Sequence, residues 1–500
     1  MNKVFTWKKY HRWIGLLMSV FMLVFCVSGI ILNHRSLFRS CDVGRWWMPT
    51  SYHISNFNNG VVKATLSLGG DSVLAYGGSG VWLTNHDANS WTQYNDGLPT
   101  GADNRNVKNI VKTKAGDVWM ATQYDVYRLS DNSWQRVTPA GVDTRIADIA
   151  LNKDSTNVVV LSRNAVYVLS DGGREIILKT PNGYKPQTTL FSTIWKLHSG
   201  ELFGTIGRLV VDAIAVVLAI LSVTGIILFA LPYGIRSNKR KGNKDGMKKL
   251  GKQMVCNQRW HNKFGYATII LTLWIAISGM CLRPPLMIPF VMTKTSQSIK
   301  HGNVWHDKLR AIRWNAADSC WLLSTSDGFL EVDENFRQTP MLIAKDKTPA
   351  VSPMGVNVME PSQNGEWIVG SFSGLYRWNP ISAQVVDYYT GKPADNKSMR
   401  AVSSTLASGY SSDFYGGKPI VFDYAKGASA KITMPEQMAE AKMSLWNVAL
   451  ELHVGRCYTP FLGPLSDMFV FISGLLISLT LISGYIILRR QKKKLRNNRQ

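Results

Sequence analysis

The sequence predicts a mixed membrane protein in which four transmembrane α-helices, built as a duplicated two-helix unit, carry an all-β periplasmic domain, a split six-bladed β-propeller. Three observations lead to this fold class. Four nearly uncharged apolar runs approach the ~20 residues that cross a bilayer as a helix. Basic residues gather beside those runs, and a strand-and-turn pattern recurs between them at a regular interval. The 45% hydrophobic composition hides this uneven distribution.

The apolar runs define the membrane segments. We expect transmembrane helices over residues 13–33, 198–232, 261–283 and 453–488, where the second and fourth ranges begin with a short membrane-edge segment. The first run is too long for the apolar core of a signal peptide, and Asn33-His34-Arg35 follows it in place of a small-residue cleavage site. We therefore interpret it as an uncleaved anchor.

Most of the net charge of +24 lies in three short segments beside the apolar runs. Residues 1–12, 233–260 and 489–500 carry +4, +8 and +7. Because cytoplasmic ends of membrane helices carry an excess of Lys and Arg, both termini and the central loop are expected in the cytoplasm. Residues 34–197 and 284–452 are then periplasmic inserts of a bacterial inner-membrane protein. No folded basic face is visible, which excludes a nucleic-acid partner, and the basic segments have membrane lipid as their expected partner.

The membrane part contains an internal duplication. The first and third segments open on a histidine followed four residues later by glycine, and a Ser-Gly pair follows at the same offset in both. The second and fourth segments are each preceded by a Leu-His pair and contain a Thr-Gly or Ser-Gly pair deep inside. Repeats of this kind place binding sites at their interface. The histidines are His11, His261, His198 and His453, and the pairs are Ser28-Gly29, Ser278-Gly279, Thr224-Gly225 and Ser483-Gly484.

A shorter repeat runs through the inserts. Its last residues are 45 and 40 positions apart in the first insert, and 46 and 46 in the second. A period of about 40 to 45 residues with several short strands is typical of a propeller blade, and propellers have about four to eight blades. A generic antiparallel β-sandwich is the alternative. The repeated ends are Gly80-Val81-Trp82, Asp125-Val126-Tyr127, Ala165-Val166-Tyr167, Gly328-Phe329-Leu330, Gly374-Leu375-Tyr376 and a weaker Ile420-Val421-Phe422.

Four membrane-edge histidines are the candidate functional residues. The predicted topology places His11 and His261 at the inner face, and His198 and His453 at the outer face, so that each half of the chain gives one histidine to each pair. Ionisable residues beside membrane segments are functional candidates, imidazole binds haem iron, and helix bundles hold cofactors between facing helices. Two haems would form an electron path across the membrane. The alternative is that these histidines are interfacial polar anchors. His34, at the outer end of the first segment, is a further candidate.

Two motifs, His11-Arg-Trp-Ile-Gly15 and the run from Leu197 to Arg208 (LHSGELFGTIGR), resemble the PepSY-associated transmembrane family. That family includes iron-regulated inner-membrane proteins and ferric-siderophore reductases. The resemblance covers the four helices and their edges, and it implies two haem b groups bound through His11, His261, His198 and His453, with electrons passing outward to ferric iron. The inserts depart from the family pattern, because propeller-like units stand where PepSY modules are expected.

The function we expect is that of an inner-membrane b-type haem protein passing electrons to a periplasmic acceptor, such as ferric iron in a siderophore or another chelate. No flavin, nicotinamide or nucleotide motif is visible, so the electron donor is expected to be a cytoplasmic protein or the quinone pool. The alternative is a non-redox, membrane-anchored propeller that acts as a sensor or interaction scaffold.

Two further pairs of side chains lie near the predicted outer face. Asp212 and Asp467 are candidates for a proton path, and the equal alternative is that they cap their helices or pair with Arg208 or Arg456. Cys41 and Cys457 lie in a compartment that permits a disulfide, and their geometry decides whether one forms.

Overall fold

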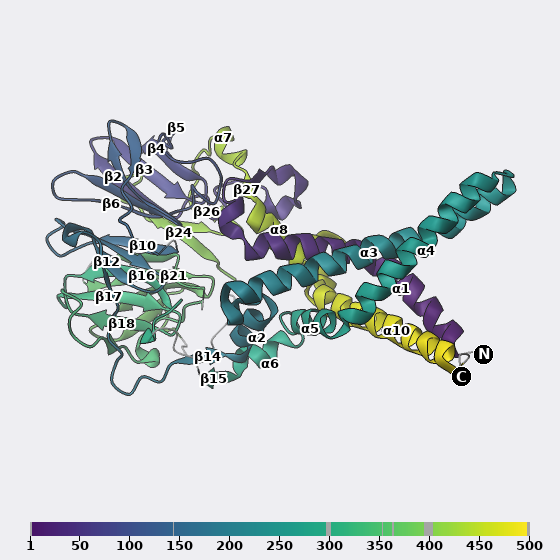
Figure 1. Ribbon diagram of the computed structural model, residues 1–500. Coiled ribbons are helices and arrows are strands. Elements are labelled where there is room, and N and C mark those ends of the chain that lie inside the picture. The colour runs from purple at the N-terminus through teal and green to yellow at the C-terminus, as the bar shows by residue number, and fades with distance from the viewer. Residues whose placement is uncertain are drawn as a thin grey trace. The chain divides into compact units, whose positions relative to one another are not determined.

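The computed structural model describes residues 3–143, 145–296, 302–352, 354–362, 365–394 and 404–497. The chain divides into two compact units (Figure 1). The first consists of Met1–Phe38, Gln187–Gln297 and Leu445–Gln500, and the second consists of Arg39–Pro186 and Ser298–Ser444. Each insert therefore contributes one part of a single compact unit, as a split domain requires.

Three unbroken helical spans of the first unit are long and apolar enough to cross a membrane, namely Trp7–Asn33, Glu201–Arg240 and Arg456–Lys493. Their main helices are α1 (Lys3–Asn33), α3 (Gly204–Arg240) and α10 (Phe469–Asn497), and α1 packs against both of the others (Figure 1). Apolar side chains on their outer surfaces are exposed, as at Leu17 and Leu209. Because such surfaces are solvated by lipid rather than by water, the chain is a membrane protein.

The fourth expected span is broken. Helices α4 (Lys244–Ala267) and α5 (Ile269–Met280) meet at a bend of 69°, so our prediction of a continuous helix over residues 261–283 is wrong. Thr268 forms the break, and its hydroxyl donates to the Phe264 carbonyl at 2.8 Å, a local bond that competes with regular helix geometry. At 12 residues, α5 is about 18 Å long and too short to cross a bilayer alone. Only the bent pair together has the length and composition of a span.

Two short helices end at candidate histidines. Helix α2 (Leu190–His198) packs on α5, and α8 (Leu445–His453) packs on α1, so each short helix lies against the other half of the duplication. Gly200 follows α2 with a φ of +78°, and a Cβ there would lie 2.3 Å from the Gly207 carbonyl oxygen. Only glycine fits this turn. The short helices α6 (Met287–Met292) and α9 (Thr459–Leu462) complete the connections.

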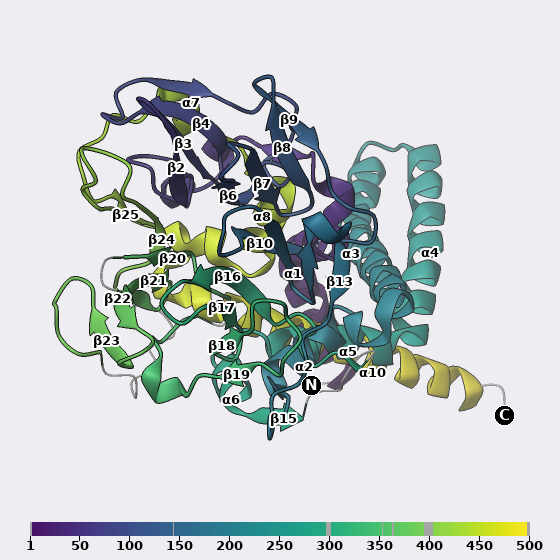
Figure 2. The same cartoon turned by 90° about the vertical axis from the view of Figure 1, so that its left-hand side faces the viewer.

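The second unit is built from small antiparallel sheets whose strands follow chain order (Figure 2). The described residues form five four-stranded sheets and one three-stranded sheet in this unit. They are β2–β5 (Ala64–Gly69, Ser72–Gly77, Gly80–Asn85, Trp91–Gln93), β6–β9 (Val107–Lys112, Val118–Thr122, Val126–Ser130, Ser133–Arg136), β10–β13 (Ile146–Leu151, Val158–Ser162, Val166–Val168, Arg174–Ile176), β16–β19 (Leu309–Asn315, Cys320–Thr325, Phe329–Val332, Met341–Leu342), β20–β23 (Val358–Pro361, Trp367–Ser371, Gly374–Asn379, Gln384–Asp387) and β24–β26 (Ala407–Ser411, Ile420–Asp423, Gly427–Ala428).

Five smaller elements form two further strand pairs and a short helix. Strands β1 (Asp42–Val43) and β27 (Met443–Ser444) pair with each other and join the two ends of the second unit, which also contains α7 (Glu436–Ala439). In the first unit, β14 (Gln187–Thr189) pairs with β15 (Lys294–Ser296).

The apolar core of the second unit lies between consecutive sheets. Buried side chains join each sheet to the next one in the chain, and a further cluster joins the last sheet to the first through Trp82 and Phe422. The Tyr410 N–H, in β24, donates to the carbonyl of Lys63, beside β2, at 2.8 Å. The first strand of each sheet lies innermost in Figure 2.

The predicted repeat falls on the second and third strands of the first five sheets. Trp82 lies in β4, Tyr127 in β8 and Tyr167 in β12, and all three are buried. In the sixth sheet our alignment of the repeat is wrong, because Ile420-Val421-Phe422 forms the second strand and pairs with β24. A short apolar run matches either buried strand, which explains the shift.

Candidate functional site

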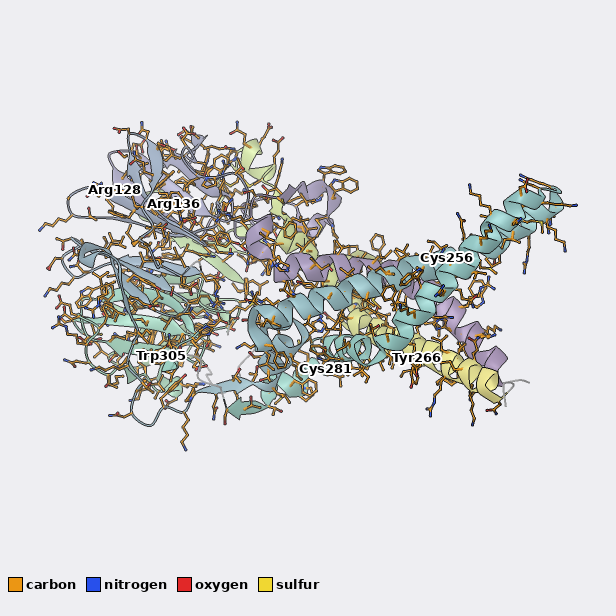
Figure 3. The ribbon with its side chains drawn as sticks, viewed as in Figure 1. Arg128, Arg136, Cys256, Tyr266, Cys281 and Trp305 are labelled. Atoms are coloured by element: carbon orange, nitrogen blue, oxygen red, sulfur yellow. The ribbon has the colours of Figure 1, made fainter. Side chains whose placement is uncertain are left out.

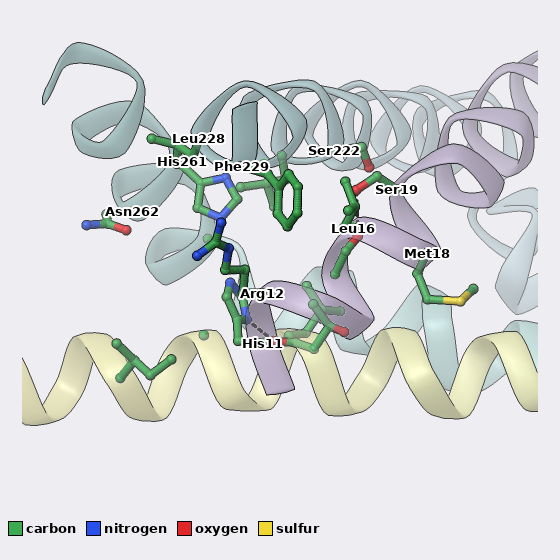
Figure 4. A pocket seen from close by; sticks show the side chains of 18 of the residues that line it. His11, Arg12, Leu16, Met18, Ser19, Ser222, Leu228, Phe229, His261 and Asn262 are labelled. Carbon is green, nitrogen blue, oxygen red and sulfur yellow. Dashed lines mark hydrogen bonds between the residues drawn. The ribbon is translucent and has the colours of Figure 1, made fainter. Parts of the chain in front are cut away.

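One histidine pair joins α1 to α4. The ring centroids of His11 and His261 lie 6.2 Å apart at an interplanar angle of 75°. Both side chains line a cavity of about 460 Å³ (Figure 4). Its walls are largely apolar and include Met22, Leu218 and Leu221, whereas Lys8 and Arg12 supply positive charge. The structure therefore brings together the two histidines that were predicted at the inner face.

The second pair joins the two short helices. His198 is the last residue of α2 and His453 is the last residue of α8. Their ring centroids lie 6.3 Å apart at an interplanar angle of 58°. The two pairs have nearly equal separations, and each combines one histidine from each half of the duplication.

All four histidines bind a hydroxyl through Nδ1. The partners come from the Ser/Thr-Gly pairs: Ser483 for His11 at 3.1 Å, Thr224 for His261, Ser278 for His198 and Ser28 for His453, the last three at 2.9 Å. In every case the hydroxyl belongs to the half of the chain that does not contain the histidine. The sequence shows the repeated Ser/Thr-Gly dipeptides, but it does not show that their hydroxyls bind the histidines.

The hydrogen bonds fix which ring nitrogen carries the proton. A hydroxyl has one hydrogen, and each of these hydroxyls donates it to a helix carbonyl; Ser278 donates to Trp274 at 2.7 Å and Thr224 donates to Ile220 at 2.7 Å. The hydroxyl oxygen must therefore accept from the imidazole. His11 Nδ1 also lies 3.0 Å from the Thr480 carbonyl oxygen, which can only accept. With the proton at Nδ1, the lone pair of the neutral ring is at Nε2, the nitrogen available to a metal.

The glycine of each Ser/Thr-Gly pair leaves room for the ring. A Cβ at Gly484 would lie 2.9 Å from His11 Cε1, and one at Gly279 would lie 3.0 Å from His198 Cε1. The corresponding distances at Gly225 and Gly29 are 3.6 and 3.5 Å, which are ordinary contacts. The hydroxyl of the dipeptide thus orients an imidazole at all four positions, whereas the glycine is needed to accommodate the ring only at Gly484 and Gly279.

His34 has a different environment from the paired histidines. Its Nε2 lies 2.6 Å from Asp212 Oδ2, and Asn33 Nδ2 donates to Asp212 Oδ1 at 3.0 Å. In the other half, Arg283 binds Asp467 at 2.9 Å. The partners that we expected for the two aspartates are wrong, because Arg208 lies beside Glu201 and Arg456 binds Glu451. Each aspartate instead ties its own half of the duplication together.

The part of the chain that the structure describes contains no cluster of three or more His, Cys, Asp or Glu side chains that could hold a metal ion. All six cysteines, including Cys41 and Cys457, are free thiols.

A family model described as the PepSY-associated TM region matches residues 8–491. A search of curated proteins finds no match. The chain is similar to the crystal structure of the extracellular domain of a protein from B. thetaiotaomicron that is named as a hybrid two-component system. That alignment has 8% identity and a TM-score of 0.37, and it covers 73% of this chain and 32% of the other. The chain thus spans about a third of that protein.

A second similar structure is a protein of unknown function from Bacteroides thetaiotaomicron VPI-5482, with 10% identity, a TM-score of 0.36, and coverage of 75% of this chain and 70% of the other. A third, the extracellular domain of a protein named as a one-component system from B. thetaiotaomicron, has 8% identity and a TM-score of 0.35. It covers 77% of this chain and 41% of the other.

Proposed function

The chain belongs to the family of the PepSY-associated TM region, and on this premise we propose that it is a b-type haem protein that passes electrons across the bacterial inner membrane to a periplasmic acceptor. The observation that carries the proposal is the spacing of the two histidine pairs, whose ring centroids lie 6.2 and 6.3 Å apart. Each pair would hold one haem b.

The spacing fits one metal ion between each pair of rings. A metal–imidazole bond is about 2.0 to 2.1 Å, and an imidazole nitrogen lies about 1 Å from its ring centre, so two imidazoles on opposite sides of one metal have centres about 6 Å apart. His11 with His261, and His198 with His453, would hold the iron of the two haems through their imidazoles. When bound, haem iron supplies one-electron redox chemistry.

The chain's own residues prepare the rings for this role. Ser483, Thr224, Ser278 and Ser28 hold the proton at Nδ1 and set the ring orientation. A hydrogen bond from the other ring nitrogen of a metal-binding histidine orients its ring and increases its basicity. The cavity of about 460 Å³ beside His11 and His261 has the size of a small-molecule or cofactor site, and most of its lining is apolar.

We propose the topology that the charge pattern supports. Both termini and the loop between α3 and α4 lie in the cytoplasm, which places His11 and His261 near the inner face and His198 and His453 near the outer face. The second unit is then periplasmic. The packing of each sheet on the next, and of the last sheet on the first, supports a six-bladed propeller split between the two inserts.

The acceptor we propose is ferric iron in a siderophore or similar chelate, because the family includes ferric-siderophore reductases. The donor is a cytoplasmic protein or a quinol. The electron would enter at the His11–His261 pair and leave at the His198–His453 pair, toward the periplasm.

The test is a visible absorption spectrum of the protein purified in mild detergent, before and after reduction by dithionite, with a pyridine haemochrome assay. We expect a low-spin b-type spectrum and two haems per chain. Replacing His198 or His453 by Ala removes one haem, and combining either change with His11→Ala removes both. A colourless protein after expression with ample haem contradicts the proposal and leaves the sensor or scaffold alternative. His34→Ala is the matched control, because His34 binds Asp212, and it retains both haems.

A further inference from the structure

We infer that the exposed side of α4 binds the phosphate headgroup of an anionic phospholipid. The site is a hollow of about 640 Å³, here called the α4 hollow, lined chiefly by Lys252, Val255, Cys256, Arg259, Trp260 and Lys263. These residues recur at helical spacing, so they lie on one side of α4. All six are exposed, and Cys256 is labelled on this helix in Figure 3.

The charge of the α4 hollow selects an anion. Its charged side chains are Lys252, Arg259 and Lys263, and no carboxylate lines it. None of the three cations forms an ion pair with a carboxylate within the described ranges. The acidic residue nearest in the helix sequence, Asp245, is seven positions before Lys252. A lipid phosphate placed among the three cations would receive charge-assisted hydrogen bonds, to which an arginine contributes a planar fork of donors.

Apolar groups beside the cations select a lipid rather than a free anion. Val255 is 64% exposed and Trp260 is 46% exposed, although both are apolar. Trp260 stacks on Phe264 with centroids 5.5 Å apart, and Lys263 Nζ lies 5.1 Å from the Trp260 ring centre. Tryptophan prefers the depth of lipid headgroups, and the apolar helix α5 begins only nine residues after Trp260. The α4 hollow therefore offers cations for the lipid phosphate and apolar side chains for the adjoining acyl region.

The site lies behind the His11–His261 cavity. The opposite side of α4 contributes Met254, Gln258 and His261 to the wall of that cavity, so one helix separates the two. A lipid bound in the α4 hollow would hold the helix that carries His261. This inference does not depend on the presence of haem, because it uses only the cations and the aromatic side chain on the exposed side.

The test is lipid retention, measured by native mass spectrometry on the full chain in detergent with added phosphatidylglycerol or phosphatidylcholine. We expect tight retention of phosphatidylglycerol only. The triple variant Lys252→Gln, Arg259→Gln, Lys263→Gln should bind it about a hundredfold more weakly, since the loss of each direct cation contact to the phosphate weakens binding roughly fivefold. The matched control is Lys241→Gln, Lys244→Gln, Lys248→Gln, which removes the same charge from the same helical hairpin.

Two results would overturn the inference. If the control triple weakens binding as much as the first triple does, the attraction is a diffuse property of the basic hairpin. If neither triple changes retention, α4 is not the site. Trp260→Ala separates the two sources of phosphate: it should weaken phosphatidylglycerol binding severalfold and leave the weak competition by water-soluble glycerol phosphate unchanged. Equal loss of both ligands would show a simple anion site.

Discussion

His198 Nδ1 and Ser278 Oγ lie 2.9 Å apart, and the same hydroxyl donates its hydrogen to the Trp274 carbonyl at 2.7 Å. The imidazole must then be the donor in the first bond. The relationship connects the end of α2 to α5, and it recurs three more times with different residues in the same roles. This hydrogen bond sets both the orientation and the tautomer of the ring, so removing the hydroxyl should alter the histidine pair.

Ser278→Ala should weaken the site formed by His198 and His453. The change removes the Ser278 acceptor and leaves the His198 ring with its backbone hydrogen bond to Ile275 as the remaining restraint. Loss of a hydrogen bond that orients a ligating histidine typically costs about 10- to 100-fold in affinity for the metal group. Haem retention during dilution and the midpoint potential are the measurements. Thr272→Val is the control on the same helix, since the Thr272 hydroxyl donates to Thr268 and does not contact a histidine. Equal retention in both variants would contradict the assigned role.

Gly484→Ala and Gly225→Ala should differ although they alter the same histidine pair. The new Cβ at position 484 would lie 2.9 Å from His11 Cε1 and must displace the ring, whereas the one at position 225 would lie 3.6 Å from His261 Cε1. We expect the first variant to lose one haem or to show a changed low-spin electron paramagnetic resonance signal. The second variant should resemble the unaltered protein. Identical spectra for the two variants would show that the glycines do not shape the site.

Asp148→Ala should destabilise the second unit strongly. Asp148 is buried and lies 2.6 Å from Arg313, and its carboxylate also accepts the backbone N–H of Ile312 at 2.9 Å. The change removes the nearer carboxylate partner of the buried Arg313 and leaves only Glu360, 3.6 Å away. We therefore expect a loss toward the lower end of the about 3 to 5 kcal/mol that breaking a buried pair costs. Urea unfolding followed by limited proteolysis of the second unit measures the loss. Asp117→Asn, which breaks the exposed pair with Arg128, should cost less than about 1 kcal/mol.

His86 should make the contact between the first and last sheets depend on pH. Its Nδ1 lies 2.6 Å from the Asp413 carbonyl oxygen and its Nε2 lies 3.1 Å from that of Gly70. Both partners only accept, so the protonated ring satisfies both, and the Asp413 hydrogen bond is the main cause that raises the pKa of His86. The stabilisation is complete below the unfolded-state pKa of about 6.5 and is lost as pH rises through the higher folded-state pKa.

Hydrogen exchange of residues 410–416, compared below and above neutral pH, measures the His86 contact. We expect faster exchange at the higher pH, after correction for the intrinsic rate. In His86→Gln this excess should disappear, because the amide does not titrate. A pH response that persists in the variant would assign it to another group.

The sequence was sufficient to predict which histidines belong together. The duplication placed His11 with His261 and His198 with His453, because equivalent positions in two repeats lie at equivalent depths. It was not sufficient to predict the hydroxyl partners, since the Ser/Thr-Gly pairs lie far from those histidines in the chain and a serine inside a helix usually bonds to its own backbone. The contact between His34 and Asp212 could not be predicted for a similar reason. The two residues lie far apart in the chain, and the repeat does not show that they are close in space.

The bend at Thr268 escaped prediction for a related reason. Hydropathy is averaged over a window of residues and does not depend on helix geometry. The window that begins near Phe264 is apolar enough for a membrane span whether the helix is straight or broken. The break lies at Thr268, and the same hydroxyl-to-carbonyl bond that Thr268 forms also occurs inside unbroken helices, as at Ser28 and Thr224, so this residue type does not mark the bend in the sequence. In the second unit, the period identified the sheets but not the strand order within the last one, since Ile420-Val421-Phe422 has the same apolar character as either buried strand.

The exchange of partners between halves has a consequence for how the molecule can be divided. Every imidazole from one half is oriented by a hydroxyl from the other, and every ring pair takes one member from each, so a single half contains all the components and cannot assemble either site by itself. Two copies of one half, related by a twofold axis, would contain both complete sites. In symmetry terms the membrane unit is an isologous dimer joined into one chain, and residue differences such as His34 against Arg283 mark where its two protomers have become distinct.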